Sequence, residues 1–526
     1  MEESGQAGPR AGRLGVVALL LGGSVVLSRL LGYVREAVLA GQLGVGPEAD
    51  AYRAAFLLPD LLGHFLTGGA LSIAFIPFYT RLRTREGSAA AERLLAVVLG
   101  TLGAVVVVAT VLLAWWAEEL VDLQFAGFAP ETRATTTRLT RILLPAQIFF
   151  VLGGVLRGVL MAQGHFASQA LAPVLYNLAI ITGGALYGAS LGAEGFAWGA
   201  LVGSLIGPFL PALIELVARQ SVRLRVRVAP WDRQFLAYLA LAAPLMLGLS
   251  MLTADEWFEK WFGASLGAGS IAQLGYARML ALLPVGVVGQ ALATAALPVL
   301  ARLWSEGRRA ELEAVVLDTL RIGLGLSLLA GGALFALAEP AVQLLYQRGR
   351  FDAADTQAVA ALLQIFAFAV PAWILQQIAV RPFYARNDTW RPMLLSSVIV
   401  LLSLPLYGSL RDALGAPGLA LAGVLAMSAN AAATLLLARW LHGAPAPTAL
   451  LGTGLRALLV AAGSTALALA LPLPGSGGAS WDAGLALLGR GTVFSLCALV
   501  CIRSVGDEAM RSALNRLLDV SRFRSS

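Results

Sequence analysis

Two arginines stand within the first long apolar stretch of the chain, where a charged side chain is costly and usually serves a function. Arg29 and Arg35 are six residues apart, which on a helix is about 9 Å along the axis, so both side chains can border one cavity. The guanidinium of arginine matches phosphate oxygens and stays charged at any relevant pH. The spacing therefore suits a diphosphate. In the alternative interpretation Arg35 lies at the membrane interface, paired with Glu36 or Asp50, and only Arg29 is buried.

Further polar residues lie near this pair or in other apolar stretches. The second apolar stretch opens with an acid and a base, and a later stretch contains an isolated arginine. Such residues inside membrane segments tend to face a cavity rather than lipid. Arg157 and Arg321 are weaker candidates of the same kind. The substrate-binding candidates are therefore Ser28, Arg29, Arg35, Asp50, Arg53 and Arg278.

A second charged cluster lies between two tryptophans at 257 and 261. Asp255 and Glu259 share one face of a helix as like charges, whereas the spacing of four lets Glu256 pair with Lys260. Two acids so placed either face water or bind a cation. We therefore take Asp255, Glu259 and Lys260 as candidates for cation binding or gating. In the alternative interpretation this cluster lies at the periplasmic interface, with the tryptophans at the level of the lipid headgroups.

Several classes of chemistry are excluded by what the chain lacks. Lys260 is the only lysine and follows Glu259 rather than glycine, so a nucleotide-binding loop is absent and ATP does not drive this protein directly. The three histidines are far apart, and no hydrolase motif is present. Cys497 and Cys501 are too few and too close for a disulfide framework or a metal site. We expect neither an enzyme nor a bound cofactor.

The elements that position these residues are membrane helices. The 526 residues are 58% hydrophobic and 13% charged, with a mean hydropathy of +0.77, whereas a soluble domain carries about a quarter charged residues. Apolar runs such as 94–115 are continuous rather than alternating, which excludes a transmembrane barrel. The sequence predicts an all-α polytopic membrane protein with about fourteen transmembrane helices: 14–32, 51–79, 94–116, 138–162, 167–191, 195–217, 234–262, 270–301, 315–337, 356–384, 392–410, 416–438, 450–472 and 480–502.

Arginine in the connecting loops predicts the orientation, because cytoplasmic loops retain positive charge. The strongly basic loops 81–93, 219–233 and 302–309 all follow even-numbered helices, whereas the loop at 118–131 and other odd-numbered loops carry acids. Both termini should therefore be cytoplasmic. The formal charge of +7 and the pI of about 9.8 reflect this topology and an arginine-rich composition rather than a nucleic-acid partner.

The chain also contains an internal repeat. Pro77 to Arg81, followed by Glu-Gly, recurs about 220 residues later as Pro298 to Arg302, again followed by Glu-Gly. Unless the matches are chance, they imply two pseudo-symmetric six-helix lobes plus two C-terminal helices, with a substrate site between the lobes. The expected organisation is an N-terminus at 1–13, an N-lobe at 14–218, a cytoplasmic linker at 219–233, a C-lobe at 234–440, helices 13 and 14 at 441–503, and a basic cytoplasmic tail at 504–526.

At four segments the sequence resembles the MurJ/MviN family of lipid II flippases: 28–37 (SRLLGYVREA), 50–52 (DAY), 56–62 (FLLPDLL) and 69–77 (GALSIAFIP). Looser similarity continues through 263–266, 284–289, 383–389 and 418–422. The resemblance implies two six-helix lobes around a cationic cavity, alternating access, and export of undecaprenyl-pyrophosphate-linked peptidoglycan precursor across the bacterial cytoplasmic membrane. It also implies a lipid-tail groove near helices 13 and 14.

Carried over residue by residue, the helix 1 motif of the family is matched here by Ser28, Arg29 and Arg35. The acid in helix 2 of the family is matched by Asp50. Other positions depart from the pattern. Where the family has a pair of arginines, this chain has Gly63 and His64. A family acid is replaced by Gly68, and a family arginine by Met279. The positions that the family associates with sodium binding are Ser403 and Tyr407 here.

We therefore expect a lipid II flippase, with membrane lipid as a further partner and neither nucleotide nor nucleic acid as a ligand. The alternatives are a flippase for another polyprenyl-diphosphate-linked glycan and a non-transporting scaffold for cell-wall assembly. A cation-drug exporter is disfavoured because a cavity lined by arginine repels cations. Without a nucleotide site, we expect the membrane potential to dominate and the coupling to a monovalent cation such as sodium to be weak.

Overall fold

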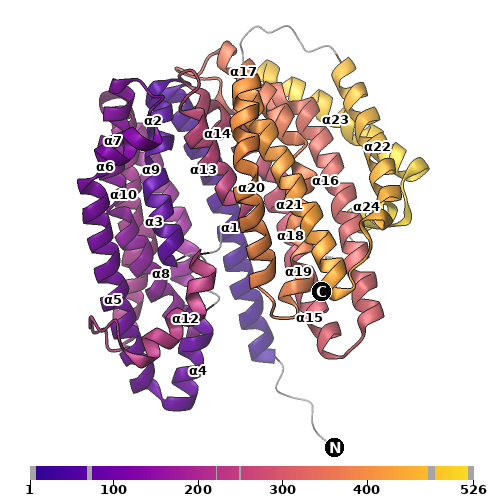
Figure 1. Ribbon diagram of the computed structural model, residues 1–526. Helices are drawn as coiled ribbons and strands as arrows, with labels where there is room; N and C mark the ends of the chain where they lie inside the picture. Colours follow the sequence, from indigo (N-terminus) through magenta and orange to yellow (C-terminus); the bar gives the residue numbers. More distant parts are fainter. Residues whose placement is uncertain (1–7, 68–73, 221, 248–249, 472–479, 519–526) are drawn as a thin grey trace, which may run out of the picture. The chain divides into compact units, whose positions relative to one another are not determined.

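The computed structural model describes residues 8–67, 74–220, 222–247, 250–471 and 480–518. Within these ranges every regular element is helical and there is no strand (Figure 1). The chain divides into two compact units, one formed by residues 1–248 with 348–351 and the other by 249–347 with 352–526.

The first unit is built around α5, whose apolar side chains are buried among those of its neighbours. Phe75, Tyr79 and Tyr238 are fully buried in the same core, and the rings of Phe75 and Tyr238 meet edge to face at 5.8 Å between centroids. The helices of this unit are α1 (Gly8–Leu43), α2 (Pro47–Ala55), α3 (Leu57–Thr67), α4 (Ile76–Glu86), α5 (Ser88–Trp115), α6 (Ala117–Gln124), α7 (Pro130–Leu143), α8 (Ala146–Ala162), α9 (Ala167–Leu191), α10 (Ala193–Ser204), the π-helix η2 (Leu205–Phe209), α11 (Leu210–Arg219) and α12 (Arg233–Leu247).

The second unit contains the remaining helices, and α22 and α23, which correspond to the expected helices 13 and 14, pack against α16. Its elements are α13 (Met251–Gly263), α14 (Ser270–Pro284), the π-helix η3 (Val285–Gly289), α15 (Gln290–Ser305), α16 (Arg309–Tyr346), α17 (Ala353–Ala367), α18 (Val370–Ala379), α19 (Arg381–Tyr384), α20 (Trp390–Leu414), α21 (Ala416–His442), the 3-10 helix η4 (Pro447–Leu450), α22 (Leu451–Ala470), α23 (Ser480–Val505) and α24 (Glu508–Leu518).

The membrane-spanning helices agree with most of the predicted ones. Among the described residues, ten helices are long and apolar enough to cross a membrane, and a pair bent by 41° at residues 368–369 raises the number to eleven. These eleven overlap eleven of the fourteen predicted spans. The predicted spans 14–32, 51–79 and 234–262 are not among them, so the count of fourteen is not confirmed. The prediction of an all-α polytopic membrane protein is confirmed.

Two of the three remaining spans are broken rather than continuous. The span predicted at 51–79 is interrupted at Phe56. In a continuous helix the ring of Pro59 would clash with the carbonyl group four residues earlier, at Ala55. Its residues 68–73, which include Gly68, lie outside the described part. The span predicted at 234–262 is divided into α12 and α13, and the Ser250 hydroxyl caps α13 by accepting a hydrogen bond of 3.2 Å from the backbone N–H of Thr253.

Small residues allow α9 and α10 to pack closely. Glycines recur every four residues along α10 and η2, at 195, 199, 203 and 207. A Cβ added at Gly199 would lie 2.8 Å from the carbonyl oxygen of Ala179 and 2.9 Å from Cα of Ile180. Membrane helices use such small-residue repeats to bring their backbones into contact. The glycine repeat therefore fixes the position of α9, which contributes to the site below.

The basic segment before α12 packs against the first unit. The backbone N–H of Arg227 donates to the carbonyl oxygen of Ala96 at 2.9 Å, and that of Ala229 donates to Oγ1 of Thr101 at 3.2 Å. Val222 and Leu224 pack on the core while Arg223 and Arg225 stay exposed. The segment predicted as a linker at 219–233 therefore lies along α5.

Candidate functional site

Arg35 of α1 and Arg53 of α2 share the carboxylate of Glu36. Arg35 Nη2 donates to Oε1 at 2.9 Å, and Arg53 Nη2 donates to Oε2 at 2.6 Å. The side chain of Glu36 is 7% exposed, whereas Arg53 is 16% and Arg35 is 25% exposed. Two guanidinium groups on one carboxylate leave a net positive charge, which the more accessible Arg35 can present to an anion.

Asn177 on α9 holds the other side of Arg35. Its Oδ1 accepts a hydrogen bond of 3.1 Å from Arg35 Nη1. Its Nδ2 donates to the carbonyl oxygens of Ser28 at 3.2 Å and Pro173 at 3.0 Å, and to the Ser28 hydroxyl at 3.4 Å. These bonds fix the amide so that its acceptor faces the guanidinium. Arg35 is therefore held by Glu36 of α1 and Asn177 of α9, and Arg53 of α2 is joined to it through Glu36.

The structure brings Ser28, Arg35 and Arg53 into one network through Glu36 and Asn177. Among the other substrate-binding candidates of this unit, Arg29 is partly buried on α1 and Asp50 is 2% exposed on α2. The pairing of Arg35 with Glu36, which belonged to the alternative interpretation, is confirmed. Arg53 binds the same carboxylate, so Glu36 accepts from two guanidinium groups.

A second network lies in the other unit and contains the predicted cation or gating residues. Arg278 on α14 donates through Nη2 to Oδ2 of Asp255 at 2.7 Å and through Nε to Oε2 of Glu259 at 2.8 Å. Arg278 Nη2 also donates to the second oxygen of Glu259, and the Tyr407 hydroxyl on α20 donates to Asp255. All four side chains are buried. The guanidinium thus lies across both carboxylates of α13.

Aromatic rings and a glycine complete the surroundings of this network. The Arg278 guanidinium lies 5.1 Å from the ring centroid of Phe366 and 5.8 Å from that of Trp373, distances at which a cation is attracted to the ring face. On α21, a Cβ added at Gly423 would lie 2.6 Å from Oδ1 of Asp255. The glycine therefore leaves the space that the buried carboxylate occupies.

These contacts decide between the interpretations of the acidic pair. Asp255 and Glu259 are 1% and 3% exposed, so in this structure neither side chain faces water. The cation beside them is the guanidinium of Arg278, which was predicted as a substrate-binding residue because it is an arginine within an apolar stretch. The predicted pair of Glu256 and Lys260 is confirmed, with 3.0 Å between the charged atoms. In the described part of the chain, no group of three or more His, Cys, Asp or Glu side chains is arranged to hold a metal ion.

The weaker candidates and the departing positions have other partners. Arg157 donates to Gln169 and to the carbonyl oxygen of Pro208 in the π-helix η2, and Arg321 donates to the carbonyl oxygen of Ala449. The Ser403 hydroxyl donates to the carbonyl of Val400 in its own helix. Gly63 lies against Gln147, since a Cβ there would be 2.6 Å from Oε1 of that amide.

Three residues of these contacts were not predicted from the sequence. They are Asn177, which accepts from Arg35, Gln147, which lies against Gly63, and Glu36 as the acceptor that two arginines share. Asn177 is one of two amides within the apolar span 167–191, with Gln169, and polar side chains inside a membrane helix are costly and tend to be functional. That signal was present in the sequence. No local signal identifies Phe366 or Trp373, because aromatic residues are common in apolar helices.

Solved structures with the same fold are membrane transporters. The chain superposes with a TM-score of 0.76 on "Lipid II flippase MurJ, inward closed conformation", with 21% identity over 92% of this chain and 99% of that one. It superposes with a TM-score of 0.66 on an inward-facing multidrug resistance MATE family transporter, with 17% identity over 78% of this chain and 94% of the other. The fold is thus that of a multi-helix membrane transporter.

Comparison of the sequence identifies the family of this chain, whereas comparison of the structure identifies its fold. The model of the family "Lipid II flippase MurJ" matches residues 39–475. The probable lipid II flippase MurJ of Rhizobium meliloti (strain 1021) is 31% identical over 422 residues, which are 78% of each chain. The lipid II flippase MurJ of Burkholderia cenocepacia is 28% identical over 71% of this chain and 74% of its own. The chain belongs to the lipid II flippase MurJ family and is a multi-pass protein of the bacterial inner membrane.

Proposed function

We propose that this chain translocates lipid II, the undecaprenyl-pyrophosphate-linked peptidoglycan precursor, from the cytoplasmic to the outer leaflet by alternating access. The observation that carries the proposal is the partly exposed guanidinium of Arg35, held by Glu36 and Asn177 in a member of this family. A diphosphate carries the charge and the oxygen acceptors that such a guanidinium binds.

In this proposal the network of Glu36 holds the arginines until substrate arrives. Arg35 keeps one bond to Glu36 and one to Asn177, which sets the plane of its guanidinium. The diphosphate binds the exposed edge of Arg35 and is joined by Arg29, with Ser28, Asp50 and Arg53 as the surrounding residues. Arg278 remains with Asp255 and Glu259 in the described conformation and is available to substrate only if that network opens.

We place the polyprenyl tail along α22 and α23. A small apolar cavity of about 170 Å³ lies beside α23 and is lined by side chains of α16, α23 and α24. Ile502 of α23 and Leu514 of α24 are among its lining residues. A hydrocarbon chain can fill such a surface because its atoms gain dispersion contacts with the apolar side chains.

Complementation tests the proposed function. Wild-type protein should rescue cells depleted of their own lipid II flippase, and Arg35→Ala should not. Arg302→Ala is the matched control, because Arg302 is 66% exposed and forms only a 4.0 Å contact with Glu306. Failure of correctly inserted wild-type protein to rescue would refute lipid II as the substrate. Rescue by Arg35→Ala would instead refute the role of this arginine in transport.

We also propose that both termini are cytoplasmic. The support is the positive charge of the loops after even-numbered helices, including the exposed arginines at 223 and 225. Single cysteines introduced at these two positions, in a chain without Cys497 and Cys501, should be protected from a membrane-impermeant thiol reagent added to intact cells. A cysteine at Asp122 should react. The reverse pattern would overturn the orientation.

For the driving force, we propose that the membrane potential dominates and that sodium dependence is weak. The support is that Arg278 already binds both carboxylates of the acidic pair, so a free cation would have to displace a guanidinium. Glu259 then modulates the movement of α13 rather than forming a strong ion site. Transport into proteoliposomes should persist without sodium when a potential is imposed. Transport that stops without sodium would contradict this proposal while leaving the substrate unchanged.

A further inference from the structure

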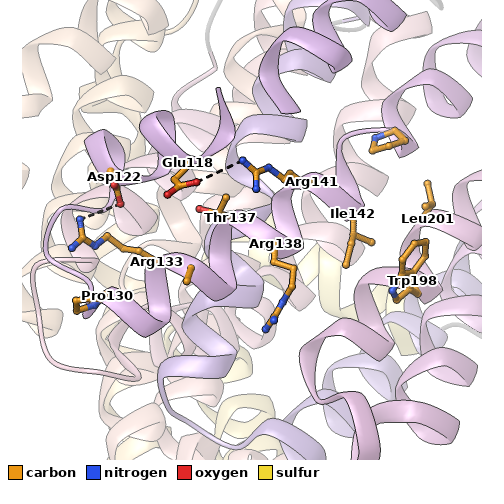
Figure 2. A pocket seen from close by; sticks show the side chains of 12 residues that line it. Glu118, Asp122, Pro130, Arg133, Thr137, Arg138, Arg141, Ile142, Trp198 and Leu201 are labelled. Atoms are coloured by element: carbon orange, nitrogen blue, oxygen red, sulfur yellow. Dashed lines mark hydrogen bonds and ion pairs between the residues drawn. The ribbon is translucent and has the colours of Figure 1, made fainter. Parts of the chain in front are cut away.

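Arg157 of α8 is an arginine within a membrane span that has no carboxylate partner among the described residues. The arginines that line a cavity of about 670 Å³ between α6, α7 and α10 differ from it, because each has an acid of its own. Figure 2 shows two of these three pairs, which are Arg133 with Asp122 at 3.1 Å, Arg138 with Glu194 at 2.6 Å and Arg141 with Glu118 at 3.8 Å. The charge of Arg157 is therefore not offset by a neighbouring acid.

The helix that carries Arg157 lies inside the helix bundle of the first unit. It packs against α3, α4, α5, α11 and η2, and none of its residues from Ala146 to Ala162 is exposed. Arg157 itself is partly buried. A charged side chain in such a position is costly, and charges that are retained inside membrane spans mostly face the interior and serve a substrate or an ion.

Two neutral acceptors fix the direction of the Arg157 guanidinium. Nε donates to Oε1 of Gln169 at 3.0 Å, and Nη1 donates to the carbonyl oxygen of Pro208 at 2.6 Å. Pro208 lies in the π-helix η2, a backbone form that is frequent at functional sites. Nη2 has no hydrogen-bond partner among the described residues and is not fully buried. This nitrogen is therefore the edge of the guanidinium that remains for an anion.

Arg157 and Arg35 are held in the same way by one helix. Asn177 of α9 accepts from Arg35 through its side-chain oxygen, and Gln169 of α9 accepts from Arg157 through its own. The two amides are eight residues apart, which on a helix is about 12 Å along the axis and about 80° around it. The two guanidinium groups therefore lie along one side of α9, and a ligand with two separated anionic groups can contact both.

We propose that Arg157 binds a peptide carboxylate of the precursor while Arg29 and Arg35 bind its diphosphate. This inference rests on the proposed function, which supplies the substrate. The peptide of such a precursor ends in a carboxylate and is separated from the diphosphate by sugar, as two separated arginines require. A carboxylate accepts charge-assisted hydrogen bonds from a guanidinium, so it can bind Nη2 while Nε and Nη1 keep their acceptors. In the proposed orientation Arg157 lies on the cytoplasmic side of Arg35, where the headgroup enters.

Two preparations of lipid II test the proposal, one with free peptide carboxylates and one with these groups converted to amides. The purified wild-type chain should bind the free form about tenfold more tightly, the difference expected for one charge-assisted hydrogen bond. Arg157→Gln should bind both forms equally, whereas Arg157→Lys should keep the preference because it keeps the charge. Arg35→Gln should weaken both forms by the same factor. Arg141→Gln is the control, since Arg141 has its own carboxylate, and it should behave as the wild type.

The outcomes separate this inference from the proposed function. Binding of both forms with equal affinity by the wild type would overturn the carboxylate site and leave lipid II as the substrate. A wild type that binds neither form would refute the proposed function itself. A preference that survives in Arg157→Gln would also overturn the proposal, as would its loss in Arg157→Lys, which would assign Arg157 a structural role. The comparison of the two lipids on the wild type does not depend on any variant folding.

Discussion

The guanidinium of Arg35 donates a hydrogen bond of 3.1 Å to Oδ1 of Asn177, a residue 142 positions later in the chain. Because Nδ2 of the same amide is anchored on Ser28 and Pro173, Oδ1 is directed at the arginine. The bond ties α1 to α9 at the level of the proposed diphosphate site. The direction of the Arg35 side chain is thus set by α9, which lies outside the sequence motif at 28–37.

Replacing Asn177 by leucine should reduce transport while the protein stays folded. The change removes the acceptor of Arg35, and a hydrogen bond to a charged group contributes about 1.5–3 kcal/mol, so initial rates of lipid II transport in proteoliposomes should fall about tenfold or more. Thr182→Val is the control, because the Thr182 hydroxyl donates only to Leu178 of its own helix at 2.8 Å. Equal rates in the two variants would remove Asn177 from the site.

Replacing Glu36 by glutamine should destabilise the first unit. Arg35 and Arg53 then lose their common counter-charge, and breaking a buried ion pair costs about 3–5 kcal/mol. Thermal unfolding in detergent should show a clear decrease for Glu36→Gln and little change for Asp412→Asn, whose side chain is 68% exposed. Adding Arg53→Met to Glu36→Gln should recover part of the loss. Additive losses in the double variant would show that the two residues do not interact.

Replacing Arg278 by glutamine should make stability depend on pH and on sodium. Asp255 and Glu259 would be left as two buried carboxylates without their guanidinium, at a cost of about 3–5 kcal/mol near neutral pH. Protonation at lower pH, or binding of sodium, relieves the repulsion, so the unfolding temperature should rise with either. The wild type should respond weakly. Arg308→Gln is the control because Arg308 and its partner Glu311 are 49% and 56% exposed; an identical response there would argue against an internal counter-ion.

Replacing Gly199 by leucine should separate α9 from α10. The added side chain would meet the backbone of Ala179 and Ile180, and overpacking of this kind costs about 1–3 kcal/mol. Transport should fall as well, because α9 positions Asn177. Gly463→Leu is a matched control, since nothing lies within 4 Å of a Cβ at that position on α22. Equal unfolding temperatures for the two variants would show that the glycine repeat is not a packing surface.

Local features of the site were predictable, and contacts between helices were not. The pair of Glu256 and Lys260 follows from a spacing of four on one helix, and the structure contains it. The breaks at Phe56 and before Ser250 escaped prediction because the spans were predicted from apolar runs alone, although Pro59 was a local signal for the first break. Hydropathy measures transfer to lipid, which is the same for a straight span and for a broken one.

The sequence by itself determined that this chain is an all-helical membrane protein with arginines inside its apolar stretches, because hydrophobicity and charge are properties of each residue alone. It also determined the family, through the motifs at 28–37 and 50–77. Only the tertiary structure decided that Arg278 binds Asp255 and Glu259 and that Asn177 holds Arg35. These partners lie on different helices, and the side chains that meet there are set by how the helices pack, through small residues such as Gly199 and Gly423, rather than by spacing along the chain.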